Sequence, residues 1–243
     1  MKAAPLPRMF AAQAGMELRL ALRRGEAVLV TLVIPPLLLV FLAQVPQIAL
    51  SVKELLPGML ALAVMSAAMV SLAISTGYER YYGVLKRLGG SPLPRWALIA
   101  AKLAATLLVE LLQLTLLAGA ALLLGWRPEG SLALTLLAML LGTAAFGGLG
   151  LWMAGSWRAE ATLAAANALY ILLLLFGGIV ASPAALPGPV GAVSSLLPSA
   201  ALADMLRGAL GAIDGGVHTG SVVTLAVWAI LAPALAAYTF KWE

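Results

Sequence analysis

Long apolar runs separated by short charged segments dominate this chain of 243 residues. A helix that crosses a membrane needs about 20 mostly apolar residues, because each helical residue rises about 1.5 Å across roughly 30 Å of hydrocarbon. Backbone groups in hydrocarbon must be hydrogen-bonded within their own segment, so the runs predict helices. The pattern therefore predicts an all-α integral membrane protein, with residues 1–243 forming a single transmembrane domain of six spans at 27–45, 57–77, 97–125, 131–155, 161–181 and 221–240.

Residues 6–26 carry apolar side chains at helical spacing, with a late cluster of arginines. The residues that follow this spacing are Leu6, Met9, Phe10, Gln13, Met16 and Leu20. Such an amphipathic helix lies in the membrane interface. Two interpretations stay open: the helix is only a cytosolic anchor, or it also contacts a partner.

Two features interrupt the pattern of spans. Pro35 and Pro36 lie at mid-depth in the first span, where they remove backbone donors and should kink or loosen the helix. Residues 182–220 are rich in proline and glycine, yet residues 199–210 read as a helix with Ser199 as a good N-cap and Gly211 as a good stop. That helix would be about 18 Å long, too short to cross. We expect a half-buried or re-entrant helix at the outer face.

The composition excludes several classes of protein. Hydrophobic residues make up 63% of the chain and charged residues only 10%, which excludes a soluble globular domain. The absence of cysteine excludes disulfides and thiolate chemistry, and a single histidine excludes a histidine metal cluster within one chain. His218 with Asp214 could suggest catalysis, but a lone histidine near an outer loop is more often solvated. We predict no catalytic residue and no metal ligand.

The basic residues indicate an orientation in the lipid bilayer. A net charge of +5 can suggest a nucleic-acid partner, but in a membrane protein basic residues stay in the cytosol. With the N-terminus inside, 12 of the 15 basic residues are cytoplasmic and only Lys53, Arg127 and Arg207 are outside. The cytoplasmic set is Lys2, Arg8, Arg19, Arg23, Arg24, Arg80, Lys86, Arg87, Arg95, Lys102, Arg158 and Lys241. We expect both termini in the cytoplasm and no nucleic-acid partner.

Polar side chains form one stripe along the third span. At 100° per residue, Lys102, Thr106, Glu110 and Gln113 fall at about 0°, 40°, 80° and 20° on the helix. Glu110 lies near mid-bilayer, where a charge is costly and usually faces the protein interior or water. The stripe indicates a translocation path or its gate, or else a buried carboxyl bonded to a neighbouring helix. Lys102 lies near the inner end, where we expect it to snorkel.

Asn167 is the clearly polar residue deep in the fifth span. Interhelical hydrogen bonding is the favoured role for it, and contact with a substrate on a path shared with Thr106, Glu110 and Gln113 is the alternative.

The segment 78–96 is a basic, aromatic island between the second and third spans. A short charged helix in this place is one that a cytosolic partner could contact and move. The residues that would meet the partner are Tyr78, Glu79, Arg80, Tyr82, Lys86 and Arg87.

The island resembles a motif of type-2 ABC transporter permeases, an export family that includes drug, antibiotic and polysaccharide exporters. The matching residues are Glu79, Arg80, Gly83, Lys86, Arg87, Leu88, Ser91, Pro92, Leu93 and the later Lys102. Residues 148–210 resemble the family's fourth and fifth spans, inner Arg-Ala-Glu loop and outer proline-rich helical hairpin. The chain departs from the family's Glu-Arg-Glu-Arg run, because Tyr81 and Tyr82 replace its second half.

The resemblance implies a six-span half-transporter that forms a dimer, which we expect to be a homodimer, and binds two copies of a cytosolic ABC ATPase. The island would be the coupling helix that contacts the ATPase. ATP and Mg would be bound by the ATPase, and this chain would carry no cofactor. The expected place is the plasma membrane of a bacterium or archaeon.

The sequence favours an ATP-driven exporter of an amphipathic, lipid-like or drug-like substrate, working by alternating access. Spans rich in Leu, Ala, Phe and Met with few charges suit such a molecule. The alternatives are a membrane-embedded enzyme, for which no convincing acid–base cluster exists, and a non-energised channel, which has no use for a coupling helix.

Overall fold

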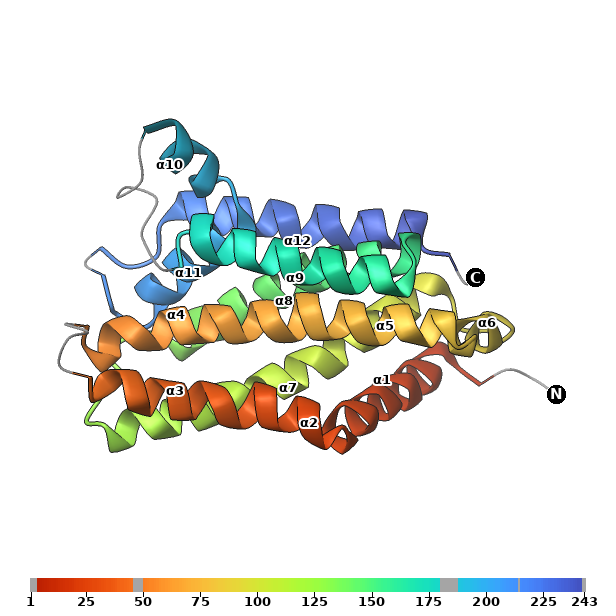
Figure 1. Ribbon diagram of the computed structural model, residues 1–243, viewed down its shortest axis with the longest axis horizontal. Helices are drawn as coiled ribbons and strands as arrows, with labels where there is room; N and C mark the ends of the chain where they lie inside the picture. Colours follow the sequence, from red (N-terminus) through yellow and green to blue (C-terminus); the bar gives the residue numbers. More distant parts are fainter. Residues whose placement is uncertain (1–3, 46–49, 180–187, 214, 242–243) are drawn as a thin grey trace.

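The computed structural model describes residues 4–45, 50–179, 188–213 and 215–241. Every regular element among them is a helix, and the helices form an elongated bundle (Figure 1). In chain order they are α1 Leu6–Arg23, α2 Gly25–Val28, the π-helix η1 Leu29–Val33, α3 Ile34–Ala43, α4 Val52–Val64, the π-helix η2 Met65–Ser71, α5 Leu72–Tyr81, α6 Val84–Gly89, α7 Arg95–Leu123, α8 Leu132–Ser156, α9 Ala159–Phe176, α10 Gly188–Ser195, α11 Pro198–Ala209 and α12 Thr219–Thr239.

Five helical segments in the described part of the chain are long and apolar enough to cross a membrane. They are Val52–Tyr81, which joins α4, η2 and α5, and then α7, α8, α9 and α12. A sixth is present only if α10 and α11, which bend by 78° at their junction, count as one span. This is the helix pattern of a multi-pass membrane protein.

The predicted first span at 27–45 is shorter than expected. Its apolar helix consists of the 5-residue η1 and the 10-residue α3, and it is not among the five full-length candidates. The π-helical turns lie directly before Pro35 and Pro36. Because proline cannot donate to the preceding turn, the wider π-helix is the loosening that the sequence predicts at this place.

The second span is longer than its predicted limits of 57–77. It begins at a cap in which the Glu54 carboxylate accepts hydrogen bonds from the Ser51 backbone N–H (2.7 Å) and hydroxyl (2.8 Å). The helix then continues to Tyr81, so that Tyr78, Glu79 and Arg80 belong to the end of the span. The prediction that placed these three residues in a separate charged helix is corrected accordingly.

Gly83 separates this long helix from α6. Its φ of +72° lies in the left-handed region, which glycine adopts without the steric cost that a side chain brings. The separate helix is therefore the six-residue α6 alone, and the rest of the predicted island is turn up to the start of α7.

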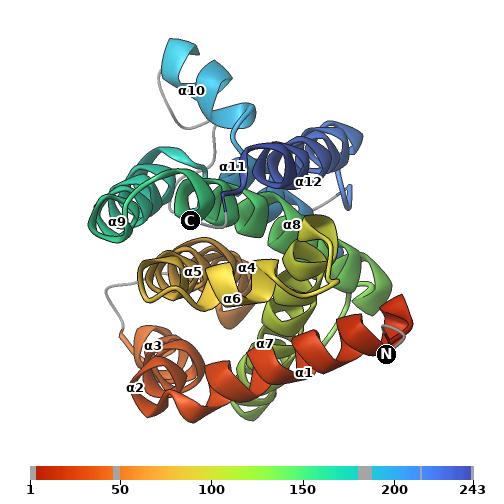
Figure 2. The same ribbon diagram turned by 90° about the vertical axis from the view of Figure 1, so that its right-hand side faces the viewer.

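The two ends of the bundle differ. α6, the start of α1 and the end of α12 lie at one end, called the α6 end below, and α10 lies at the other (Figure 1). α1 leaves the direction of the bundle and crosses this end against α7 (Figure 2). The predicted interfacial helix at 6–26 is thus a helix over Leu6–Arg23 that packs on a span.

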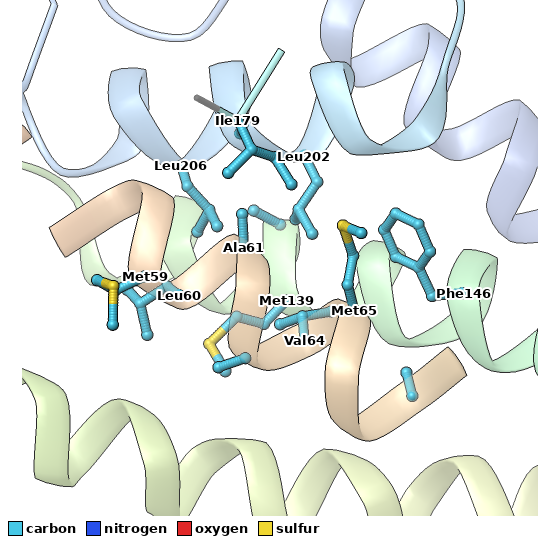
Figure 3. Close-up of a cluster of buried hydrophobic side chains, with 14 of the residues drawn as sticks. Met59, Leu60, Ala61, Val64, Met65, Met139, Phe146, Ile179, Leu202 and Leu206 are labelled. Carbon is cyan, nitrogen blue, oxygen red and sulfur yellow. The ribbon is translucent and has the colours of Figure 1, made fainter. Parts of the chain in front are cut away.

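The main core lies between α4, η2, α8 and α11. Leu202 and Leu206 of α11 share one buried cluster with Val64, Met65 and Met139 (Figure 3). Of the two alternatives predicted here, the half-buried helix is wrong, because nine residues of α11 are buried. The re-entrant helix stays a prediction, since the 78° bend between α10 and α11 fits either a broken span or a re-entrant loop. α11 begins at Pro198, one residue before the predicted cap, and its predicted stop at Gly211 is confirmed by a φ of +73°.

Glycines in α8 allow close approach by its neighbours. A Cβ on Gly148 would overlap the backbone of Ala232 and Pro233 in α12. A Cβ on Gly150 would lie 2.7 Å from the carbonyl oxygen of Met69 in η2. α8 is therefore the helix around which the second and last long spans are packed.

Candidate functional site

Three helices meet at the side chain of Lys102 near the α6 end. Its Nζ lies 2.8 Å from Oε1 of Glu17 in α1 and 2.7 Å from Oε2 of Glu79 in α5. The Lys102 side chain is fully buried, and the side chains of Glu17 and Glu79 are only 10% and 13% exposed. Gln13 adds a hydrogen bond of 2.8 Å to Glu17. The expectation that Lys102 snorkels was wrong, because it is the shared partner of two carboxylates.

Arg80 ties the end of α5 to the loop between α8 and α9. Its guanidinium donates a hydrogen bond of 2.6 Å to the carbonyl oxygen of Trp157. Arg80 and Glu79, whose carboxylate is bound by Lys102, therefore both have partners within this chain. The resemblance to a permease motif predicts both residues as ATPase contacts, and the structure gives them internal partners.

The remaining residues of the predicted contact lie on the surface. Tyr82, Lys86 and Arg87 are exposed, as is Tyr81, while Tyr78 is half-buried. The Tyr82 ring stacks on Tyr78 with centroids 6.2 Å apart and meets Tyr81 edge-on at 5.1 Å. The exposed residues are thus tyrosines at the end of α5 and basic side chains on α6.

An apolar cluster attaches α6 to the bundle beneath this surface. Leu85 is fully buried and packs with Leu93, with Leu98 at the start of α7 and with Phe240 after α12. Met9 of α1 lies against the same cluster. Side-chain packing thus joins α6 to α1, to the start of α7 and to the residue after α12.

The predicted stripe of α7 does face the protein interior. Glu110 is fully buried and accepts a hydrogen bond from the hydroxyl of Thr143 in α8. Gln113 is buried and donates a hydrogen bond of 2.7 Å to the carbonyl oxygen of Thr31 in η1. Both residues therefore bond to neighbouring helices, which is the structural interpretation of the stripe.

Thr106, one helical turn from Lys102, has a different environment. It is half-buried, its hydroxyl donates a hydrogen bond of 3.0 Å to the carbonyl oxygen of Lys102, and it lines a cavity of about 70 Å³. Glu17, Glu79 and Lys102 line the same cavity. The part of the stripe that reaches open space is thus its inner end.

Asn167 does not join the stripe. It lies on the exposed side of α9, and its side-chain amide donates a hydrogen bond of 2.8 Å to the carbonyl oxygen of Leu163 in its own helix. Within the described part of one copy, its side chain forms no hydrogen bond to another helix.

His218 lies at the other end of the bundle from α6. Its Nδ1 is 2.9 Å from Asp204, which also accepts a hydrogen bond of 2.5 Å from Ser221. Asp214, the partner considered from the sequence, lies outside the described residues. Because the hydroxyl of Ser221 bonds to the carboxylate and not to the imidazole, this cluster lacks the nucleophile–base contact of hydrolases. Among the residues described, no group of three His, Cys, Asp or Glu side chains could hold a metal ion.

Sequence reasoning missed Glu17, Thr143 and Trp157 as partners of the site. Glu17 follows Gln13 by four positions on an otherwise basic and apolar helix, and this spacing was a usable signal for a polar contact. Thr143 sits in a run of small residues that gives no such sign. The Trp157 contact uses a backbone carbonyl, which no sequence pattern reveals.

A family model described as "ABC-2 type transporter" matches residues 11–210, which cover most of the chain. The match includes the Lys102 cluster, α6 and the whole of the buried helix α11. No curated protein matches this chain.

Proposed function

Because the chain belongs to the ABC-2 type transporter family, and is a membrane-spanning permease subunit in it, we propose that it exports an amphipathic, lipid-like or drug-like substrate with energy from a separate ABC ATPase. In this proposal the complex holds two copies of the permease and two of the ATPase, with α6 and both termini in the cytoplasm. ATP and Mg are bound by the ATPase subunits.

The observation that carries the proposal is the construction of α6. The helix places Lys86 and Arg87 on the surface, beside the exposed Tyr81 and Tyr82 at the end of α5, and is attached inward by Leu85. Charged groups such as Arg87 can form charge-assisted hydrogen bonds with carboxylates of a partner, and tyrosines supply area that tolerates water on one side. Such a surface is suited to reversible binding of the ATPase.

We assign the six predicted coupling residues to two roles. Tyr82, Lys86 and Arg87, with Tyr78 behind them, form the contact with the ATPase. Glu79 and Arg80 act as positioning residues that pass movement of α6 to Lys102 and to the α8–α9 loop. A shift of α6 then moves α1, α5 and α7 together, because all three share the buried ions.

The alternating-access path is proposed to start at the inner end of α7. Thr106 lines open space there, whereas Glu110 and Gln113 hold α7 to α8 and η1 and would act as fixed points of the gate. Asn167, on the exposed side of α9, would then face lipid or the second permease copy.

The test is ATP-driven transport by the permease reconstituted in proteoliposomes with a cognate ABC ATPase. Arg87→Glu combined with Tyr82→Ala should lower ATPase binding about tenfold or more, since a charge-assisted contact is worth about 1.5–3 kcal/mol. The matched control is Arg127→Glu, an exposed charge reversal at the opposite end of the bundle. Undiminished ATPase binding and transport in the α6 variant would reject this contact, and absence of transport with any ATPase would reject the exporter.

A further inference from the structure

The two π-helical segments η1 and η2 line the same groove. A groove of about 630 Å³ lies between the first apolar helix and the second span. Its lining residues are Arg24, Gly25, Val30, Thr31, Ser66, Val70, Ser71, Ile74 and Ser75. Binding sites for small molecules measure about 300–1,000 Å³, and π-helical turns occur frequently at functional sites. The groove therefore has the size and the backbone irregularity of a ligand site.

Two serine hydroxyls in this groove have no hydrogen-bond partner among the described residues. Ser75 behaves as serine usually does inside a helix, with its hydroxyl bonded at 3.1 Å to the carbonyl oxygen of Leu72. Ser66 and Ser71 are half-buried in η2 and form no such bond within the described part of the chain. Both hydroxyls line the groove and can donate to or accept from a polar ligand there.

Arg24 gives the groove a charged end. It lies at the break between α1 and α2 toward the α6 end, it is exposed, and it lines both the groove and the cavity beside Lys102. Glu79 attracts Arg24, but the carboxylate of Glu79 is already bound by Lys102 at 2.7 Å. No other side chain that the structure describes forms an ion pair with Arg24. A guanidinium in this state is suited to a phosphate or carboxylate group.

We propose that the groove between η1 and η2 binds an amphiphile with an anionic head group, taken from the membrane leaflet at the α6 end. The head group pairs with Arg24 at the Glu79 end of the second span, and the rest of the molecule extends along Ile74, Val70 and Val30, with Ser71 and Ser66 beside it at increasing distance from Arg24. The inference rests on the proposed function and narrows its substrate class to anionic amphiphiles.

The chain has no cysteine, so one introduced cysteine reports on the groove without background. Val70→Cys lies inside it, and the control Val227→Cys lies on the exposed side of α12. The purified chain is placed in phosphatidylcholine nanodiscs without ATPase, and the rate of thiol modification is measured. The probes are dodecyl phosphate, dodecyltrimethylammonium and inorganic phosphate. Dodecyl phosphate should slow modification of Val70→Cys and leave Val227→Cys unchanged, while the other two probes protect neither.

Arginine variants test the head-group contact. Arg24→Gln should raise the half-protecting concentration of dodecyl phosphate about tenfold or more, as expected for loss of a charge-assisted contact. Arg24→Lys should keep part of the protection. Arg23→Gln removes the adjacent exposed charge, which lies outside the lining of the groove, and should change the concentration less than about twofold.

Several outcomes would overturn the proposal. Equal protection by the cationic probe, or equal effects of Arg23→Gln and Arg24→Gln, would mean non-specific adsorption. Full protection by inorganic phosphate would mean an anion site without a chain. A Val70→Cys that forms disulfide dimers would mean that a second copy covers the groove. A Val70→Cys that is unreactive before any probe is added would mean that the groove is closed, or is filled by phosphatidylcholine without need of an anionic head group. Since no ATPase is present, these results are separate from a failure of ATP-driven transport.

Discussion

At the scale of single residues, the ion pairs of Lys102 with Glu17 and Glu79 are the most buried ion pairs among the described residues. Lys102→Met would leave the largely buried carboxylates of Glu17 and Glu79 without their cation. Because breaking a buried ion pair exposes an uncompensated charge to a low dielectric, we expect a loss of about 3–5 kcal/mol in unfolding free energy. The measurement is the thermal unfolding midpoint of the purified chain in detergent.

The matched control for this change is Lys53→Met in the exposed pair that Lys53 forms with Glu129 at 2.6 Å. The hydrogen bond from Lys53 lowers the pKa of the Glu129 carboxyl, but both side chains stay in water. We expect the control to unfold at nearly the wild-type temperature. Equal losses in the two variants would show that the ions at Lys102 do not hold α1, α5 and α7 together.

At the scale of elements, the hinge between the second span and α6 is a single left-handed glycine. Gly83→Ala meets no atom within 4 Å, so its cost is the backbone conformation alone, about 1–2 kcal/mol. The strain is relieved if α6 moves, and we expect a lower ATP turnover of the permease–ATPase complex with the spans still folded.

Gly90→Ala at the other end of α6 is the control for this hinge. Its φ is −79°, which any residue adopts, and a Cβ there meets only the carbonyl oxygen of Arg87 at 3.4 Å. ATP turnover should therefore stay near wild type. A Gly90→Ala variant as impaired as Gly83→Ala would attribute the effect to general sensitivity of α6 and not to the left-handed turn.

At the scale of the whole molecule, the distribution of basic residues predicts the orientation. Ser91 is exposed near α6, and Arg127 is exposed in the turn after α7, at the opposite end of the bundle. In intact cells a membrane-impermeant thiol reagent should label Arg127→Cys directly and label Ser91→Cys only after permeabilisation. The physical reason is the retention of Lys and Arg on the cytosolic side during insertion. Labelling of Ser91→Cys from outside would show that the bundle has the opposite orientation in the membrane.

The sequence by itself determined the helical membrane class, the approximate position of the long spans and the buried stripe of α7. These follow from local properties, because hydrocarbon requires about 20 apolar residues per crossing and a helix repeats every 3.6 residues. Gly211 was likewise readable as a stop. The limits of the second span were not readable, since Glu79 and Arg80 are polar enough to end a span but have partners elsewhere in the chain, Lys102 and Trp157.

Only the tertiary structure decided which polar groups meet. A helical wheel places Lys102 and Glu110 on one face but cannot show that α1 brings Glu17 to the first and α8 brings Thr143 to the second. It marks Asn167 as polar and deep, and cannot show that its amide bonds to its own helix. Burial of α11 and alignment of η1 with η2 across one groove also depend on packing between distant segments, which minimises unpaired polar groups and empty space over the whole bundle.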